Sequence, residues 1–361
     1  MNTEGMLESL RRQIDDLDSK MVKLLNDRTK IVQRIGELKR QTSAEVYHPN
    51  REQQVYERII SENTGPLPDD TLRSIYRELM AGSRALERPL KVSYLGPVGT
   101  FSFVAAKKSF GASVEYLPQR GIDEVFREVE TARANYGIAP AENSTEGSIR
   151  ETLNMFQECD VKICAEVVLP IHHSLMSRCT DGKGIGRIYS KLQVFSQCRG
   201  WLSSNFPEAK LLEVGSTAEA AQMAEREDGT AAIAHAEVAG PYNLNILYGN
   251  IEDDPNNVTR FYVLSKSFSS PSGKDKTAVM CNIKNQVGAL YEILNPFKKY
   301  GINLTNIESL PSGKKAWDYS FYMEFEGHVQ DDHVKRALER VSRVCAALNV
   351  LGSFPRCNQF S

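Results

Sequence analysis

The stretch VSYLGPVGTFS, residues 92–102, contains the pattern that decides the fold class of most of the chain. An apolar run at 92–95 predicts a strand, and the small and hydroxyl-bearing residues after it predict a turn into a helix. The stretch YGIAPAENSTEG, residues 136–147, repeats this arrangement. Further apolar runs alternate with helical patterns, at 114–117, 161–169, 188, 211–212 and 231–234. This alternation predicts an α/β fold with a mainly parallel sheet, and its length predicts two lobes.

A third stretch, NNVTRF at residues 256–261, places a carboxamide, a hydroxyl and a guanidinium before an apolar strand. We expect that strand, 259–266, to return to the first lobe, so that Thr259 lies at the cleft between the lobes. By itself, a threonine before an arginine is more often a structural hydroxyl beside a surface salt bridge. The turns after the two earlier strands expose free backbone N–H groups that suit an anion. The three stretches together therefore favour a site.

Residues 1–89 carry a heptad pattern instead. The apolar positions are Leu7, Ile14, Met21 and Ile35 in one series, and Leu10, Leu17, Leu24, Ile31 and Leu38 in the other. They predict one amphipathic helix of about 50 Å at 1.5 Å per residue. Two short helices cannot cover so long a stripe, so we expect a second copy of the chain to cover it.

Arg28 interrupts the first apolar series, and a cation in an apolar seam is costly unless it is paired. It predicts either a carboxylate on a partner helix or an anionic ligand. Lys39 lies three turns further on the same face. Arg11 is 17 residues before Arg28, roughly 25 Å along the helix, so both cannot hold one small molecule in the same chain. An antiparallel dimer could bring Arg11 into the partner's site.

The last part of the chain follows a polar linker at residues 267–276. Its pattern is strand, helix, strand, strand, helix, strand, at 278–283, 288–299, 302–310, 319–325, 332–347 and 350–354. That order is βαββαβ and predicts a ferredoxin-like domain.

Composition narrows the function classes. Lys+Arg 44 against Asp+Glu 46 with no basic stripe argues against nucleic acid as a partner. No apolar run is long enough for a membrane span, and no secretory signal is expected at residues 1–13. Seven cysteines without a Cys-x-x-Cys pair predict reduced thiols and a cytoplasmic protein. Adjacent His172 and His173 would point to opposite faces of a strand, so we expect no metal site at this pair.

Residues 90–266 resemble the prephenate dehydratases. Besides the three stretches above, IHHSL (171–175), YSKLQVFSQCRGWL (189–202), STAEAA (216–221) and AAIA (231–234) carry the likeness. The resemblance implies a two-lobed, periplasmic-binding-protein-like form in which Thr259, the threonine of the TRF motif, is catalytic and donates a proton. It also suggests substrate contacts from Thr100, Ser102, Asn143, Ser144, Gln197, Thr217, Arg260 and Phe261. Each of the hydroxyl and amide residues among these is equally consistent with a helix cap or turn.

Residues 6–88 resemble the all-helical chorismate mutases. The matching residues are Arg11, Arg28, Lys39, Arg51, Glu52 and Ser83, with Glu87 where glutamine is frequent. The resemblance implies that Arg28 and the partner's Arg11 hold the carboxylates of chorismate. It further implies that Lys39 and Glu87 face the ether oxygen and that Glu52 takes the ring hydroxyl. His48 stands where an acidic residue is usual, which leaves that contact open.

Residues 277–361 resemble the ACT amino-acid-sensing domain through NQVGALYEIL (285–294) and INLTNIESLPS (302–312). The resemblance implies phenylalanine bound between two such domains. The residues expected to hold it are Asn285, Gly288, Ala289, Leu290, Glu308 and Ser309. Val287 and Leu310 replace the usual proline and arginine, so a dimerisation module that binds nothing is the alternative.

The whole chain resembles the bifunctional chorismate mutase/prephenate dehydratases. We expect an all-α mutase module at 1–89, a two-lobed α/β dehydratase at 90–266 and a βαββαβ ACT domain at 277–361. The resemblance implies a cytoplasmic, cofactor-free homodimer or homotetramer that converts chorismate to prephenate and prephenate to phenylpyruvate, with L-phenylalanine as inhibitor. The alternative is a non-catalytic amino-acid-sensing regulatory protein, because a two-lobed binding fold with a sensing domain could act as a receptor without turnover.

Overall fold

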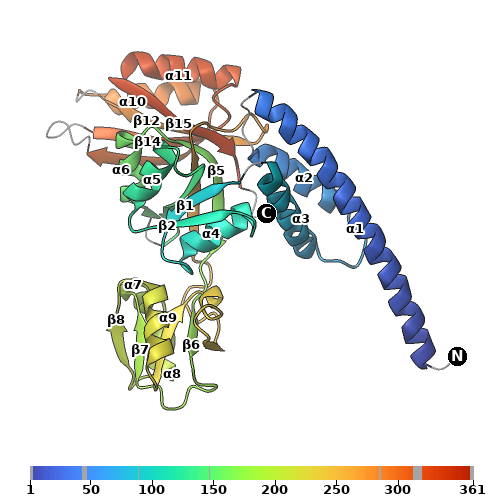
Figure 1. Ribbon diagram of the computed structural model, residues 1–361. Coiled ribbons are helices and arrows are strands. Elements are labelled where there is room, and N and C mark those ends of the chain that lie inside the picture. Colours follow the sequence, from blue (N-terminus) through green and yellow to red (C-terminus); the bar gives the residue numbers. More distant parts are fainter. Residues whose placement is uncertain are drawn as a thin grey trace. The chain divides into compact units, whose positions relative to one another are not determined.

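The computed structural model describes residues 3–42, 47–87, 89–145, 147–283, 286–311 and 319–357, without the side chains of 39–42 (Figure 1). It divides into two compact units. One comprises Met1–Leu90 with Gly111–Val114, and the other Lys91–Phe110 with Glu115–Ser361.

The first unit consists of α1 (Thr3–Thr42), α2 (Pro49–Ser61) and α3 (Asp69–Glu87). The predicted long amphipathic helix is confirmed, since α1 has 40 residues and is about 60 Å long. Pro49 opens α2, where the missing N–H costs no hydrogen bond. Val55 and Ile59 of α2 pack against Met80 of α3. The apolar stripe of α1 stays exposed in the single chain, with Leu24 at 68%.

The first lobe of the second unit carries the segments that the sequence motifs singled out. Its strands are β1 (Lys91–Leu95), β2 (Glu115–Gln119), β3 (Tyr136–Asn143), β4 (Gly147–Ser148), β5 (Lys162–Pro170) and β11 (Val258–Ser265). Its helices are α4 (Phe101–Phe110), α5 (Ile122–Glu130) and α6 (Arg150–Glu158). β1 pairs in parallel with β2 and β3, whereas β11 lies antiparallel between β3 and β5. The prediction that the final strand returns to the first lobe is confirmed.

The second lobe has its own five-stranded sheet, in the order β10-β6-β9-β7-β8. The strands are β6 (Ser174–Ser177), β7 (Arg187–Ser190), β8 (Lys210–Glu213), β9 (Thr230–Ala234) and β10 (Asn245–Tyr248). The helices are α7 (Leu192–Gln197), α8 (Arg199–Asn205), α9 (Thr217–Arg226) and the short η1 (Ala236–Val238). β7, β8 and β9 are parallel, as predicted. The antiparallel strands β6 and β10 were not predicted.

The C-terminal domain has the predicted βαββαβ order. Its elements are β12 (Asp275–Asn282), α10 (Ala289–Lys299), β13 (Leu304–Pro311), β14 (Tyr319–Glu326), α11 (Asp332–Val344) and β15 (Ala347–Pro355). β13 lies at the edge of the sheet, and α10 and α11 lie side by side on it (Figure 1).

This domain shares a sheet with the first lobe. β15 pairs in parallel with β5 at Gly352 and Ile163. A Cβ at Gly352 would lie 2.2 Å from the carbonyl oxygen of Ile163, so only glycine allows this approach. Leu310 and Phe354 join Phe156 and Leu264 of the lobe in one buried core. The shared sheet and core explain why both belong to one compact unit.

Candidate active sites

A cavity of about 400 Å³ lies within the helical unit. It is lined by Arg28, Ile31, Val32, Ile35, His48, Arg51, Glu52, Val55, Arg58, Tyr76, Met80, Ser83, Arg84 and Glu87. Four of these residues are arginines and two are glutamates, so the lining has a formal charge of 4 − 2 = +2 when His48 is neutral. Cationic walls of low dielectric attract an anion, so the cavity suits a small dianion.

Arg28 is oriented by a chain of hydrogen bonds. Its Nη1 donates to Ser83 Oγ at 2.9 Å, and that hydroxyl donates to the carbonyl oxygen of Leu79 at 2.7 Å. A guanidinium has five donors, and N–H groups beyond the one on Ser83 can therefore bind a ligand. The structure therefore brings Arg28 and Ser83 together across α1 and α3, as the sequence pattern suggested for one site.

Glu52 pairs with Arg84, which local sequence reasoning missed. The carboxylate of Glu52 accepts a hydrogen bond from Arg84 Nη1, and the Arg84 side chain is only 5% exposed. Its guanidinium also stands 5.4 Å from the ring centroid of Tyr47. Burying a cation in this way requires a carboxylate partner. Arg84 of α3 thus holds Glu52 in place. The only sequence signal for Arg84 was that the Glu52 carboxylate needs a cationic partner.

The other predicted residues of this site are found in three settings. Arg51 and Glu87 line the cavity, and Glu87 packs so closely on α1 that a Cβ at Gly36 would lie 2.8 Å from its Cγ. Arg11 is exposed on α1 and lies apart from the residues that line the cavity. The side chain of Lys39 lies outside the described residues.

A second polar group forms in the other unit, where β3 and β11 lie side by side. Asn143 Nδ2 donates to Thr259 Oγ1 at 2.8 Å and to Asn257 Oδ1 at 3.0 Å. Asn143 is itself oriented by Thr145, whose backbone N and Oγ1 donate to Asn143 Oδ1 at 3.0 and 2.6 Å. Asn143, Asn257 and Thr259 are all more than 90% buried. The carboxamide of Asn257 stood in the NNVTRF motif but was not among the predicted contacts.

The two segments are tied by their backbones as well. Ser144 N donates to the carbonyl oxygen of Val258 at 2.9 Å, and Val258 N donates to Ser144 Oγ at 3.0 Å. Since Thr259 Oγ1 accepts from Asn143, its own proton remains available to donate. A hydroxyl polarised by an amide donor and fixed in direction is suited to give a hydrogen bond or a proton to a bound group.

The remaining predicted contacts of this site are more scattered. Thr100 caps α4, because its Oγ1 accepts from Phe103 N at 3.3 Å while donating to Leu95 O at 2.7 Å. Ser102 is buried within α4, and Thr217 is buried at the start of α9. Gln197 ends α7. Phe261 is a core side chain with 2% exposure.

Three comparisons identify the family. Sequence profiles match chorismate mutase type II over residues 10–88, prephenate dehydratase over 92–269 and the ACT domain over 277–343. The bifunctional chorismate mutase/prephenate dehydratase of Aquifex aeolicus is 43% identical over 354 residues, which cover 97% of this chain and 98% of that protein. The Pseudomonas aeruginosa protein is 42% identical over 99% of both chains. The chain belongs to the bifunctional chorismate mutase/prephenate dehydratases. The family predicted from the motifs is confirmed.

A crystal structure supports the same assignment. The prephenate dehydratase of Arthrobacter aurescens, solved in complex with L-Phe, has a TM-score of 0.69 at 32% identity. The match covers 74% of this chain and 90% of that one.

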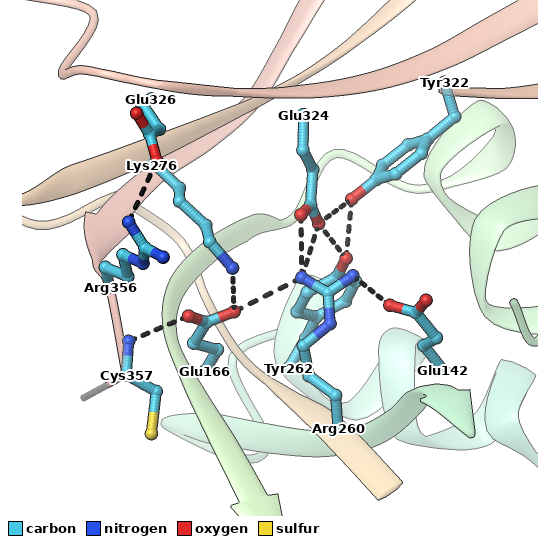
Figure 2. Close-up of polar contacts among 10 residues, drawn as sticks. All are labelled: Glu142, Glu166, Arg260, Tyr262, Lys276, Tyr322, Glu324, Glu326, Arg356 and Cys357. Atoms are coloured by element: carbon cyan, nitrogen blue, oxygen red, sulfur yellow. Dashed lines mark hydrogen bonds and ion pairs between the residues drawn. The ribbon is translucent and has the colours of Figure 1, made fainter. Parts of the chain in front are cut away.

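Arg260 follows Thr259 but faces a different environment in this bifunctional protein. Neighbouring side chains on a strand point to opposite faces. The Arg260 guanidinium lies 2.7 Å from Glu142, 3.2 Å from Glu166 and 2.7 Å from Glu324, which belongs to the ACT strand β14 (Figure 2). The structure therefore engages Arg260 with three carboxylates and does not bring it into the polar group of Thr259.

Burial and charge oppose each other in this cluster. Burial by itself would lower the pKa of Arg260, but Tyr262, Glu324, Tyr322 and Glu166 together raise it above its ordinary value. For Glu324, burial by itself would raise the pKa, because it disfavours the charged form of either group. Arg260 and the surrounding hydrogen bonds nevertheless lower the pKa of Glu324. Both groups are therefore charged at neutral pH.

The predicted regulatory residues lie on two elements of the ACT domain. Gly288 precedes α10 with φ +83°, and Ala289 and Leu290 begin that helix. Glu308 and Ser309 lie on the edge strand β13. Glu308 Oε1 accepts a hydrogen bond from Ser148 of the dehydratase at 2.8 Å. Leu310 is buried in the shared core, and Asn285 lies outside the described residues.

Among the described residues, no group of three or more histidine, cysteine, aspartate or glutamate side chains could hold a metal ion. In the same part of the chain, none of the helices has the length and apolar character needed to cross a membrane.

Proposed function

We propose that the helical domain converts chorismate to prephenate and that the two-lobed domain converts prephenate to phenylpyruvate. The observation that carries the proposal is the conjunction of two polar sites with the family assignment over nearly the whole chain. The relatives named above are bifunctional enzymes, so the alternative of a non-catalytic sensing protein is not favoured.

The mutase reaction is a rearrangement within one molecule, so the site needs no nucleophile. It must hold a dianion in a compact conformation and stabilise the charge that grows on the ether oxygen. We assign Arg28 and the partner's Arg11 to the two carboxylates, because a guanidinium matches a carboxylate bidentately. Lys39 and Glu87 are assigned to the ether oxygen, and Glu52, held by Arg84, to the ring hydroxyl. Arg51 and Ser83 complete the proposed site.

The dehydratase reaction removes a carboxylate and a hydroxyl from prephenate together. The electron pair of the breaking bond to CO₂ enters the ring, and the ring expels the hydroxyl as it becomes aromatic. A proton delivered to the departing oxygen makes water the leaving group. We assign that proton to Thr259, polarised by Asn143, with Thr100, Ser102, Ser144, Gln197 and Thr217 as candidate contacts to the substrate. Arg260, paired with three carboxylates, and Phe261, buried in the core, support the strand of Thr259 without contacting the substrate.

We further propose that the protein is a homodimer or homotetramer that acts in the cytoplasm. The exposed apolar stripe of α1 needs a covering partner, and Arg11 can reach a mutase site only in that partner. None of the seven cysteines, all of which lie among the described residues, forms a disulfide, which suits a reducing compartment. L-phenylalanine is proposed as an inhibitor bound between paired ACT domains, because the Arthrobacter relative was solved with L-Phe.

One experiment tests both activities. The purified protein is given chorismate and prephenate in separate assays, and the consumption of chorismate and the formation of phenylpyruvate are measured. Arg28→Ala should abolish the mutase and spare the dehydratase, whereas Thr259→Ala should do the reverse.

Matched controls are Arg34→Ala, on an exposed part of α1 outside the cavity, and Thr230→Ala, a buried threonine of β9. Both should keep both activities. A Thr259→Ala protein that makes phenylpyruvate at the normal rate would overturn the assignment of Thr259. A wild type without either activity would leave the sensing protein as the better account.

A further inference from the structure

His173 lies where the chain crosses from the first lobe to the second. It follows β5 and directly precedes β6, and its side chain is 1% exposed. The crossover is tied to the segment that carries Thr259, because Ile171 N donates to the carbonyl oxygen of Asn257 at 2.8 Å. His173 is therefore a buried polar side chain beside the proposed dehydratase site, and nothing in the proposed reaction uses it directly.

Among the described residues, the imidazole of His173 has one hydrogen-bond partner. Its Nε2 lies 2.8 Å from Oε1 of Gln197. An amide oxygen only accepts, so Nε2 carries the hydrogen. Nδ1 is buried and has no hydrogen-bond partner among the described residues. Burial lowers the pKa of His173, which keeps the ring neutral at pH 7.

The surroundings hold both partners still. Glu252 Oε2 accepts from the backbone N of His173 at 2.8 Å, and Glu252 Oε1 lies 2.6 Å from Nδ1 of His172. The next residue, Asp253, donates its backbone N to the carbonyl oxygen of Gln197 at 2.7 Å. One short segment thus fixes the backbones of His173 and Gln197 together.

An aromatic contact restricts the imidazole ring further. Phe101, which follows Thr100 at the start of α4, meets the His173 ring edge-on at a centroid distance of 5.8 Å. It also meets His235 at 5.3 Å. The ring of His173 is therefore packed from the first lobe and hydrogen-bonded from the second.

We propose that His173 is a positioning residue of the dehydratase, which fixes the amide of Gln197 so that its NH₂ end is presented to the carboxylates of the substrate. The inference rests on the proposed dehydratase function. An amide has an acceptor end and a donor end, and a Gln197 oxygen held by His173 turns the nitrogen the other way. Carboxylates can only accept hydrogen bonds, so the reversed amide would repel them.

The test is prephenate saturation kinetics on His173→Met and His173→Gln. Methionine fills similar volume without a donor, so KM should rise roughly tenfold to a hundredfold, the worth of one hydrogen bond to a charged group. kcat should change much less. Glutamine carries an N–H₂ at nearly the reach of Nε2, so His173→Gln should recover most of the affinity.

A double-mutant cycle with Gln197→Met separates positioning from packing. If His173 acts through Gln197, the double variant should bind no worse than Gln197→Met alone. Additive losses, or equal KM values for His173→Met and His173→Gln, would overturn the proposal. Mutase turnover, measured on the same samples, should stay unchanged because the mutase belongs to the separate helical unit, and a kcat near that of the wild type reports that the dehydratase unit is folded.

The ranking of His173→Met and His173→Gln by their affinity for prephenate can also be measured without turnover. Calorimetry of prephenate binding in a Thr259→Ala background should give weak binding for His173→Met and near-normal binding for His173→Gln. This order together with an inactive wild type would refute the proposed reaction and leave the positioning role standing. Equal affinities for the two variants would refute the positioning role.

Discussion

Replacing Arg260 with methionine tests the buried charge cluster that joins the dehydratase to the ACT domain. Methionine has a similar length and no charge. The wild-type cluster contains Glu142, Glu166 and Glu324 against Arg260 and Lys276, a formal charge of 2 − 3 = −1 (Figure 2). The substitution changes this to 1 − 3 = −2.

The loss of stability in Arg260→Met depends on which of the three carboxylates is left without a cationic partner. Glu142 has a side chain that is 39% exposed and remains solvated, and Glu166 keeps Lys276 at 3.1 Å. Glu324 is 1% exposed and keeps, among the described residues, hydrogen bonds from the hydroxyls of Tyr262 and Tyr322 and the charge of Lys276, with which it forms no direct ion pair. Removing one partner of a buried ion pair costs about 3–5 kcal/mol in the free energy of unfolding. Glu142→Gln should cost only about 0–1 kcal/mol, because its carboxylate is partly in water.

The deficit should depend on pH. The pKa of Glu324 is below its ordinary value of 4.5 in the wild type, so its stabilising contribution is present above pH 4.5 and is lost as pH falls through the folded value. In Arg260→Met burial dominates and should raise that pKa, so stability is lost as pH rises. The difference between the two proteins should therefore be largest near neutral pH and shrink toward acid.

Urea unfolding, monitored through dehydratase activity, measures the loss in free energy of unfolding. Mutase activity in the same samples serves as the reference for the separate helical unit. Glu142→Gln is the matched control at the same guanidinium. If Arg260→Met and Glu142→Gln destabilised the protein equally, or if the deficit grew toward acid, the assignment of the cost to an unpaired Glu324 would be refuted.

Two further predictions concern regulation and the mutase. Ser148→Ala removes the hydrogen bond that phenylalanine is proposed to break, so it should tighten phenylalanine binding by calorimetry about tenfold or more and slow the uninhibited dehydratase. Unchanged phenylalanine affinity and an unchanged uninhibited rate would show that inhibition does not pass through this bond. Glu87→Gln should make mutase turnover nearly independent of pH, because an amide donates to the ether oxygen at every pH whereas a carboxyl donates only when protonated. Superposable pH–rate profiles of the two proteins would exclude Glu87 as the donor.

The sequence predicted the elements of this fold well where its patterns are local. Each predicted element rests on an apolar pattern of short period. The structure contains the long helix predicted from the heptad in residues 7–38, the strand–turn–helix units and the βαββαβ order. The pairing of Asn143 with Thr259 was foreseen only as membership of one site. It depends on β11 inserting between β3 and β5, and the predicted return of that strand made the contact possible.

Contacts between distant residues were not predictable in the same way. Arg84 pairs with Glu52 across 32 residues, His173 with Gln197 across 24, and Arg260 with Glu324 across 64. No periodicity connects such positions, and even where one partner was singled out, as Glu52, Gln197 and Arg260 were, its motif did not identify the other. Gly352 likewise gave no local signal, because its need for a bare Cα arises from the strand β5, which lies far from it in the sequence.

The energies of the two links between the ACT domain and the dehydratase decide which of them could transmit an effector signal. An effector shifts an equilibrium by a coupling free energy of about 1–3 kcal/mol. Breaking the buried pair of Arg260 and Glu324 would cost about 3–5 kcal/mol, which exceeds that range. The hydrogen bond from Ser148 to Glu308 is worth about 1.5–3 kcal/mol, within reach of one bound amino acid.

Ser148 also lies at the right place for such a signal. It belongs to β4, which pairs with β3 so that Glu142 faces Ser148 and Asn143 faces Gly147. A ligand that engages Glu308 competes directly with Ser148 for the same carboxylate. Loss of that bond would loosen the hairpin that orients Asn143, and therefore the proton of Thr259. Phenylalanine inhibition should accordingly act through β13 and β4, while Arg260 and Glu324 stay paired in both states.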